Sequence, residues 1–587
     1  MPDPAAAFSG CEVTPAASEA EARERLATVY ARIANRGPDP TWIHCVSERE
    51  NQERLAQRMA GEAPRGPLAG VPFAIKDNID LEGVPTTAAC PDFSYTPTRS
   101  AAVVERLLAA GAIPVGKTNL DQFATGLVGV RSPYGVPANP FHPDIIPGGS
   151  SSGSAVAVAA GLCSFSLGTD TAGSGRIPAM LNGLVGLKPT RGLLSTTGVV
   201  PACRSLDCVS IFARSCGDVA AVFQVAAGYD ADDPFSRVAA PPAAPLPWPP
   251  RVGIPRRDQL EFFGNEEAAS LFDLALAQWR QLGANLVEID FTPFREAARL
   301  LYEGAWVAER YAALRTFIDL KPDSVHPVTR GIIEGARRLS AADAFDSIYR
   351  LAALRRQADA VWSAIDLLVT PTAGTIYRVS DVLADPLRTN TNLGAYTNFM
   401  NLLDLAGLAV PAGRFSCGVP FGITLAGPAF HDDRLLAWGA RFLGEPPPPP
   451  ALALPPGPLV RLAVCGAHLA GLPLNPQLVQ RGARLARTTR TAPTYRLYAL
   501  PGSEPRKPGL VRVDDGGGAS IEVEVWEMPL DHYGSFVAGI PAPLGIGRIS
   551  LDDGEQVQGF LCEAHAVRGA QDITAFGGWR AFLASRQ

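Results

Sequence analysis

Histidine and cysteine, which hold most protein-bound transition metals, are few and scattered in this sequence. The 587-residue chain has seven histidines without the short spacings of a zinc site, and ten cysteines without a CxxC pair. We therefore expect no metal and no cofactor. Isolated cysteines in a chain of this size are typical of reduced, mostly buried thiols rather than of a disulfide-linked secreted domain.

Long apolar runs and an excess of basic residues are also missing. No segment approaches the roughly 18 apolar residues that span a bilayer, and residues 1–18 lack the basic stretch and apolar core of a signal peptide. The net charge is -6, with 47% hydrophobic and 19% charged residues. These values predict a soluble cytoplasmic protein that binds neither a membrane nor nucleic acid.

Proline marks the main division of the chain. Residues 444–458 contain five consecutive prolines followed by Pro-Pro-Gly-Pro, which predicts an extended, semi-rigid linker. In residues 1–443 helical periods alternate with short apolar strands, which is typical of an α/β layered sheet, and helices dominate residues 266–364. Residues 459–587 predict a small α+β domain of mostly antiparallel strands, closed by a helix over 572–585.

Two glycine- and serine-rich segments flank a run of small apolar residues. Residues 148–154 (GGSSSGS) precede the run 155–167, and residues 168–176 (GTDTAGSGR) follow it. Glycine lets backbone N–H groups approach a reacting carbonyl, so two converging loops of this kind suit an oxyanion site. Either loop alone is equally typical of a turn beside a core helix. A lysine upstream, within the apolar strand predicted over 71–79, favours the catalytic interpretation.

A serine nucleophile needs a base within hydrogen-bond reach. The histidine near these loops, His142, lies on a proline-rich connection. Lys76 is the better candidate, because desolvation in an apolar strand favours its neutral amine. Ser150 would then relay the proton between Lys76 and Ser174. The alternative is that Lys76 extends to solvent or pairs with Asp77.

These residues resemble the amidase signature family, with its Ser–cis-Ser–Lys triad, and the resemblance covers about residues 20–443. It extends through residues 176–179 (RIPA), 186–190 (GLKPT) and 205–207 (SLD). The resemblance implies a mixed sheet covered by helices, with Ser174 as nucleophile, Ser150 as the bridging serine after a cis peptide bond, and Lys76 as general base. It also implies an oxyanion hole formed by the backbone N–H groups of Thr171, Ala172, Gly173 and Ser174.

Three positions depart from the family's common pattern: Ser152 and Ala172 replace usual glycines, and Gly175 replaces a bulky residue. The TDTAGSGR variant resembles the allophanate hydrolase branch of the family. A small residue at 175 suits a small polar substrate better than a fatty amide.

A second segment, residues 301–311 (LYEGAWVAERY), resembles the one that holds the substrate's carboxylate in that branch. The match implies that Tyr302 and Arg310 bind this carboxylate. Eight helical residues turn about 800°, so both side chains would reach one side of a cleft. The alternative for Arg310 is an exposed helix charge paired with Glu309.

Residues 465–475 resemble the start of the C-terminal domain of allophanate hydrolases, which is similar to the γ-glutamylcyclotransferase fold. The resemblance associates this domain with decarboxylation of N-carboxycarbamate, and it implies that His468 takes part. The alternative is a structural histidine in a dimerisation domain.

The combined prediction is hydrolysis of allophanate to ammonia and carbon dioxide by a homodimer. Because the chain contains no biotin-attachment motif, we expect a separate biotin-dependent urea carboxylase as pathway partner. Two alternatives remain at this point. One is another amidase, such as a glutamine-hydrolysing amidotransferase subunit or a broad-specificity amidase. The other is a non-catalytic subunit that keeps the amidase fold.

Overall fold

The computed structural model describes residues 11, 13–59, 66–240, 246–452, 459–502, 506–514 and 516–586. The chain divides into two compact units, residues 1–452 and 453–587, and each has its own hydrophobic core. Of the segment predicted as a linker, residues 453–458 lie outside the described residues.

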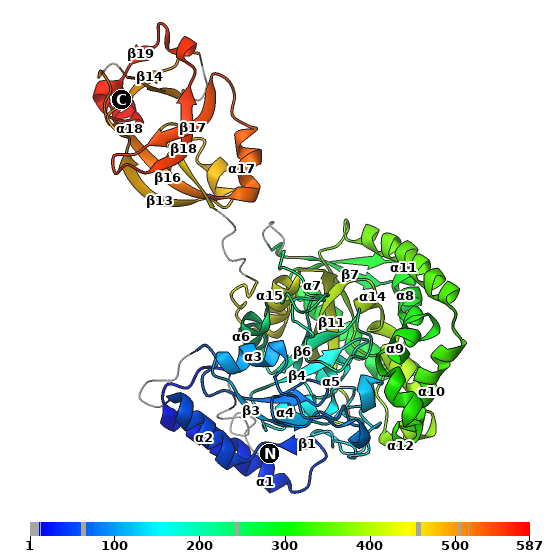
Figure 1. The fold of residues 1–587 in the computed structure, drawn as a ribbon. Coiled ribbons are helices and arrows are strands. Elements are labelled where there is room, and N and C mark those ends of the chain that lie inside the picture. Colours follow the sequence, from blue (N-terminus) through cyan, green and yellow to red (C-terminus); the bar gives the residue numbers. More distant parts are fainter. Residues whose placement is uncertain are drawn as a thin grey trace. The chain divides into compact units, whose positions relative to one another are not determined.

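A mixed sheet forms the centre of the first unit (Figure 1). In the order in which they pair, its described strands are β1 (Trp42–Cys45), β3 (Ile113–Thr118), β2 (Pro72–Lys76), β4 (Phe165–Asp170), β6 (Cys208–Ala213), β5 (Val185–Lys188), β10 (Leu405–Arg414), β11 (Pro420–Pro428), β9 (Leu367–Pro371), β7 (Arg251–Pro255) and β8 (Asn285–Ile289). Strand β2 is parallel to β3 and β4, whereas β4 is antiparallel to β6. Every residue of β2, β3, β4, β5, β6 and β9 is buried, which is typical of strands covered on both faces.

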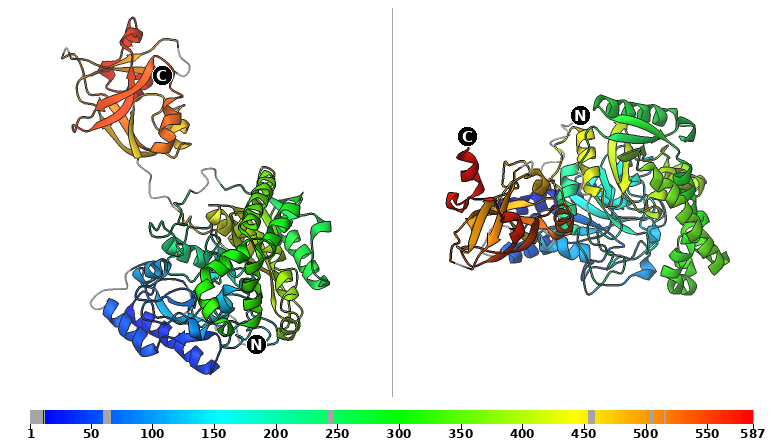
Figure 2. Two further views of the ribbon diagram at one scale, coloured as in Figure 1. Left: turned by 45° about the vertical axis from the view of Figure 1, so that its right-hand side comes forward. Right: turned by 90° about the horizontal axis from the view of Figure 1, so that it is seen from above.

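Helices cover this sheet, as the sequence predicts (Figures 1 and 2). They are α1 (Glu19–Arg36), α2 (Glu48–Met59), α3 (Ala102–Ala109), α4 (Ser152–Ala159), α5 (Ile177–Leu181), α6 (Cys216–Ala226), α7 (Glu266–Gln281), α8 (Thr292–Glu303), α9 (Trp306–Leu320), α10 (Pro327–Glu334), α11 (Ala341–Val361), α12 (Val379–Ala384), α13 (Arg388–Leu393), α14 (Phe399–Leu402) and α15 (Asp432–Leu443). Helix α8 packs against α9 and α11. The mostly helical region predicted over 266–364 also contains the edge strand β8, whose five residues are too few to stand out in a helical pattern.

Helix α4 lies in the interior and sets the position of the first glycine-rich segment. All of its residues are buried. A Cβ atom at Gly153 would lie 2.4 Å from the carbonyl oxygen of Thr41, so only glycine allows the helix this close to the neighbouring backbone. Because β2 and β4 are parallel, with Ile75 opposite Leu167, Lys76 and residues 168–170 emerge at the same edge of the sheet.

The second unit contains a five-stranded and a three-stranded sheet among its described residues. The larger sheet comprises β13 (Arg484–Arg490), β16 (Glu522–Pro529), β12 (Leu459–Val464), β18 (Gln556–Cys562) and β17 (Leu544–Ser550), and the smaller comprises β15 (Pro508–Arg512), β14 (Tyr495–Ala499) and β19 (Gln571–Asp572). The helices are α16 (Pro476–Val479), α17 (Leu530–Val537) and α18 (Trp579–Ala584). The α+β class is as predicted, although β12 pairs in parallel with β18.

Three elements of this unit were not predicted. Strand β13 is almost wholly exposed and polar, so it lacks the alternating pattern of a half-buried strand. Strand β18 and helix α17 were also missed. The closing helix is shorter than predicted, because Gly577 adopts a left-handed conformation with φ of 68° just before it.

In the described ranges, no helix is long and apolar enough to cross a membrane. The same ranges contain no cluster of three histidine, cysteine or acidic side chains that could hold a metal ion.

Candidate active site

Lys76 and Ser150 meet at the carboxyl end of β2. The Lys76 Nζ donates to Ser150 Oγ at 2.8 Å and to Thr169 Oγ1 at 2.7 Å. All three side chains are buried, and the peptide bond between Gly149 and Ser150 is cis. The short strand therefore fixes the amine against one serine hydroxyl and one threonine hydroxyl.

Burial lowers the pKa of Lys76 to about 7, against the opposing charges of Asp121, Asp170 and Asp207. Neither alternative placement of this lysine is present. The side chain is fully buried rather than extended to solvent. The neighbouring Asp77 forms its ion pair with Lys117 at 3.0 Å, which leaves Lys76 without a directly bonded carboxylate among the described residues. Lys76 can thus hold or release a proton near neutral pH.

Ser174 lies in the turn between β4 and α5, with 3% of its surface exposed. Its Oγ donates to the carbonyl oxygen of Gly126 at 3.4 Å. Within the described part of the chain, no hydrogen bond joins Ser150 to Ser174, so only the Lys76–Ser150 half of the expected relay is formed. Catalytic hydrogen bonds commonly tighten only in the complex with substrate.

The backbone N–H groups of residues 171–174 have no acceptor among the described residues, and so they remain available to an incoming oxygen. The ends of this turn are tied together by a buried ion pair. Arg176 donates Nε and Nη2 to the two carboxylate oxygens of Asp170, each at 2.9 Å. Asp170 also accepts the N–H of Gly175 at 3.0 Å. The arrangement suits stabilisation of an oxyanion.

Glycine is required within this turn by close packing. A Cβ atom at Gly173 would lie 2.4 Å from Thr397 Oγ1. One at Gly175 would lie 2.6 Å from the Cβ of Ser210. The small residue at 175 therefore has a packing reason that is independent of substrate size, which corrects the interpretation drawn from the sequence. Ala172, in place of a glycine, is accommodated within the core.

Arg310 is 1% exposed and forms no ion pair with any described residue. Its Nη1 donates to Thr125 Oγ1 at 3.3 Å, and its buried Nε has no hydrogen-bond partner among the described residues. Glu309, the alternative partner, instead accepts from the backbone and hydroxyl of Ser205 at 2.7 and 2.8 Å. A buried, unpaired guanidinium beside the nucleophile's loop is suited to an anionic substrate group.

Tyr302 lies against this guanidinium, with the Cζ of Arg310 5.5 Å from its ring centroid. The expectation that one helix carries both residues was wrong. Helix α8 ends at Glu303 and α9 begins at Trp306, with Gly304 in an extended conformation between them. A Cβ at Gly304 would lie 2.6 Å from the carbonyl oxygen of Leu300, so this glycine permits the break. The two side chains meet across the break rather than along one helix.

Asp207 supports the turn from below. Burial raises its pKa, and its carboxylate accepts the Thr171 hydroxyl and the backbone N–H groups of Ala202 and Cys203. Together with the Ser205–Glu309 bonds, this contact links residues 205–207 both to the oxyanion turn and to helix α9.

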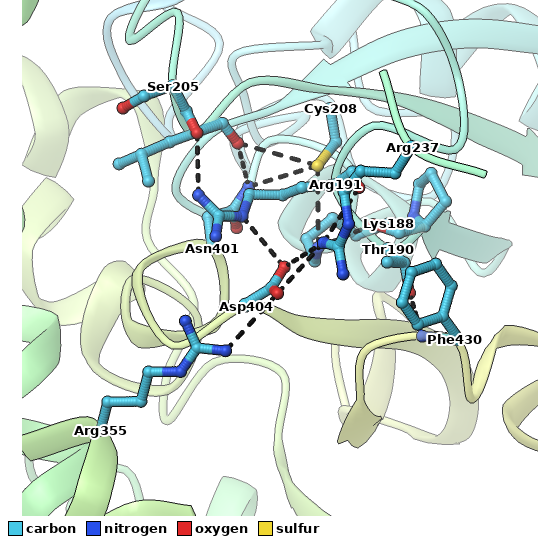
Figure 3. Close-up of polar contacts among 12 residues, drawn as sticks. Lys188, Thr190, Arg191, Ser205, Cys208, Arg237, Arg355, Asn401, Asp404 and Phe430 are labelled. Atoms are coloured by element: carbon cyan, nitrogen blue, oxygen red, sulfur yellow. Dashed lines mark hydrogen bonds and ion pairs between the residues drawn. The ribbon is translucent and has the colours of Figure 1, made fainter. Parts of the chain in front are cut away.

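A second polar network buttresses the same segment (Figure 3). Asn401 donates to the carbonyl oxygens of Asp170 and Leu206, both at 2.8 Å. Arg191 donates to the carbonyl oxygen of Ser205 at 2.8 Å. The carboxylate of Asp404 binds three arginines, which are Arg191 at 3.2 Å, Arg237 at 2.8 Å and, from helix α11, Arg355 at 3.6 Å.

Three residues of the site were not assigned from the sequence: Thr169, Asp121 and Thr125. Strand alternation could have identified Thr169, which lies beside Lys76 across the β2–β4 pair. Asp121 binds the backbone N–H groups of Gly129 and Arg131, both at 2.9 Å, and shapes the loop that holds Thr125. That loop has no local signature, because its partners lie on distant segments.

In the second unit, His468 follows β12 and lines a cavity of about 270 Å³. Its Nε2 lies 3.1 Å from Gln477 Oε1. The imidazole stacks on Phe560 with ring centroids 5.0 Å apart, and burial lowers its pKa. The histidine singled out from the sequence therefore borders an enclosed space.

Comparisons with known proteins agree with this architecture. The amidase family model matches residues 24–436, and the model of the allophanate hydrolase C-terminal domain matches residues 460–584. A urea amidolyase of Saccharomyces cerevisiae is 43% identical over 96% of this chain but only 32% of its own length. A second urea amidolyase, from Lachancea kluyveri, is also 43% identical, over 93% of this chain and 31% of its own length. The chain thus spans about a third of these relatives.

Among solved structures, a Kluyveromyces lactis allophanate hydrolase matches with a TM-score of 0.74 and 42% identity, covering 97% of both chains. A glutamyl-tRNA(Gln) amidotransferase chain from Symbiobacterium thermophilum is 37% identical, over 72% of this chain and 93% of its own length. The predicted amidase signature fold and the resemblance to allophanate hydrolases are both confirmed. The chain belongs to the amidase family, and its second unit is an allophanate hydrolase C-terminal domain.

Proposed function

We propose that this amidohydrolase cleaves allophanate, releasing ammonia and, through both units, carbon dioxide. The observation that carries the proposal is the buried Arg310, which has no carboxylate partner among the described residues and binds Thr125. Thr125 directly precedes Gly126, whose carbonyl oxygen accepts the hydroxyl of Ser174. An anion bound at Arg310 would therefore lie beside the nucleophile. The similarity to an allophanate hydrolase over 97% of both chains supports this substrate.

In the first reaction, the neutral amine of Lys76 takes a proton through Ser150 as Ser174 attacks the terminal amide carbon of allophanate. The N–H groups of residues 171–174 stabilise the oxyanion. The tetrahedral intermediate collapses, the C–N bond breaks, and the amine leaves as ammonia with the proton returned through Ser150. Water then attacks the acyl-enzyme and releases N-carboxycarbamate, while Tyr302 and Arg310 hold the substrate's carboxylate.

In the second reaction, the C-terminal unit converts N-carboxycarbamate to carbamate and carbon dioxide. The C–N bond breaks, its electron pair stays on nitrogen, and nitrogen takes up one proton. His468 lies in the cavity that would hold this small dicarboxylate. Carbamate then decomposes to ammonia and a second carbon dioxide.

The substrate assignment predicts a strong preference that depends on Arg310. Ammonia release from allophanate, glutamine and propionamide is compared for the wild-type chain and Arg310→Met. We expect allophanate to be preferred, and its kcat/KM to fall by about 10²-fold or more in the variant, because a charged hydrogen-bond partner is lost from a buried site. Hydrolysis of propionamide, which has no carboxylate, changes little.

Arg315→Met is the matched control, because this arginine lies on the same helix but is exposed. Equal rates for allophanate and propionamide in the wild-type chain would favour a broad amidase, and a preference for glutamine would favour an amidotransferase subunit. Either result would overturn the assignment.

For the second reaction, we expect His468→Ala to release the first ammonia at a near-normal rate while N-carboxycarbamate accumulates. Carbon dioxide is measured at alkaline pH, where the free intermediate decays slowly. His565→Ala is the control, since this side chain is 67% exposed and pairs with Glu563. Wild-type release of carbon dioxide by His468→Ala would show that the histidine is structural.

The remaining predictions concern partners. Supply of allophanate by a biotin-dependent urea carboxylase, and assembly as a homodimer in the cytoplasm, stay predictions. Copurification with the carboxylase activity and the mass of the assembly in solution are the measurements that check them.

A further inference from the structure

The cavity around His468 contains one charge that the proposed chemistry does not yet use. Its lining includes the turn from Val464 to His468, several apolar side chains of α17 and the strands, and the side chain of Lys507. None of the described lining residues is an aspartate or a glutamate. The cavity therefore has positive character without a compensating carboxylate.

The backbone around Lys507 is firmly placed. Its carbonyl oxygen accepts the N–H of Leu500 at 3.1 Å. The following residue, Pro508, begins β15 and packs on the turn that carries His468, where a Cβ at Gly466 would lie 2.5 Å from the proline ring. Lys507 makes no ion pair with any described residue. Its ammonium group is thus held at the cavity by its backbone and is available to a ligand.

His468 is unsuited to supply this charge itself. The imidazole lies between Phe560 and Phe536, with centroid separations of 5.0 and 5.4 Å. Burial is the main cause that lowers its pKa, and the nearby charge of Lys507 adds to the effect. A neutral imidazole can exchange a proton but attracts an anion weakly, which leaves Lys507 as the cation of the cavity.

We propose that Lys507 binds a carboxylate of the ligand and makes this cavity selective for a small dicarboxylate over a monocarboxylate. The assignment deepens the proposed second reaction and rests on it for the identity of the natural substrate. N-carboxycarbamate carries two carboxylates, whereas carbamate carries one. The attraction to Lys507 is therefore stronger for substrate than for product, so loss of carbon dioxide weakens binding and favours product release.

The test measures binding separately from turnover, with malonate as probe, because it holds two carboxylates at nearly the same separation. The full chain is labelled with ¹³C-histidine, and the His468 signal is assigned by its loss in His468→Ala. Malonate is titrated into the wild-type chain, Lys507→Met and Lys507→Arg. Arg506→Met is the matched control, since this exposed neighbour removes the same charge but does not line the cavity.

We expect malonate to shift the His468 signal, with half-saturation weakened about tenfold or more in Lys507→Met, as for loss of a charged hydrogen bond. Lys507→Arg retains most of the affinity, and Arg506→Met matches the wild type. Acetate binds more weakly, and Lys507→Met affects it less. In turnover of allophanate, Lys507→Met releases the first ammonia normally while N-carboxycarbamate rises to a higher steady level.

Two outcomes would overturn the role of Lys507: no response of His468 to malonate in the wild-type chain, or equal half-saturation in Lys507→Met. A different result would overturn only the proposed second reaction. If malonate binds in a Lys507-dependent way but the wild-type chain does not shorten the lifetime of N-carboxycarbamate, the dicarboxylate site stands and its natural ligand is another dicarboxylate.

Discussion

Ser174→Ala is expected to reduce ammonia release from allophanate by about four to six orders of magnitude, as for removal of a nucleophile that acts in one unit with its base. The hydroxyl of Ser174 is the group beside the free N–H donors of residues 171–174, and alanine removes it without filling new space. Initial rates of ammonia release measure the effect. Mass spectrometry of quenched reactions should show an acyl adduct in the wild-type chain and none in the variant.

Ser164→Ala is the matched control for this substitution. Ser164 is buried, and its hydroxyl has no hydrogen-bond partner among the described residues, so its loss leaves the site intact. Wild-type turnover by Ser174→Ala would contradict the assigned nucleophile. It would also revive the alternative of a subunit that keeps the amidase fold without using this serine.

Lys76→Met is expected to lower kcat/KM by about three orders of magnitude or more, within the range for loss of a general base and of the group that orients Ser150. In the wild-type chain, activity should follow the neutral amine. Burial places the pKa of Lys76 at about 7, below its ordinary value. The base is therefore protonated and inactive below this pH, and kcat/KM rises about tenfold per pH unit until it levels above pH 7.

Lys76→Arg separates the charge of this side chain from its role as a base. Arginine keeps a positive charge but does not lose its proton near neutral pH, so it should remain inactive up to high pH. Thermal unfolding of both variants checks that the fold is retained. Activity of Lys76→Arg, or a wild-type rate that falls as pH rises through 7, would contradict the role of a neutral amine.

The local parts of the site were accessible from the sequence, since each lies within a short pattern. Lys76 was expected in an apolar strand, and Ser150 and Ser174 in glycine-rich turns, and each occupies such an element. What the sequence could not supply is contact between distant segments. Arg310 binds Thr125 across 185 positions of the chain, and Asn401 reaches Asp170 across 231. Such pairs depend on tertiary packing and leave no periodic trace.

The errors in the fold have related causes. The predicted continuous helix over residues 302–310 failed because its periodicity continues through Gly304, where a short break changes direction without changing the pattern. Strand β13 was missed because its exposed face removes the apolar alternation on which the prediction depends. The meaning of Gly175 was misread for a third reason, because a single sequence does not distinguish space needed by Ser210 from space needed by a ligand.

The fork between Asp170 and Arg176 has a consequence for when the oxyanion donors are ordered. It closes a ring of only seven residues, and these donors lie inside that ring. Their dipoles thus share one orientation before any substrate arrives, although this brings mutual repulsion among N–H groups that bind no described acceptor. The chain overcomes this repulsion once, when it folds, and not again in each turnover. A looser ring would fold more readily and catalyse more slowly.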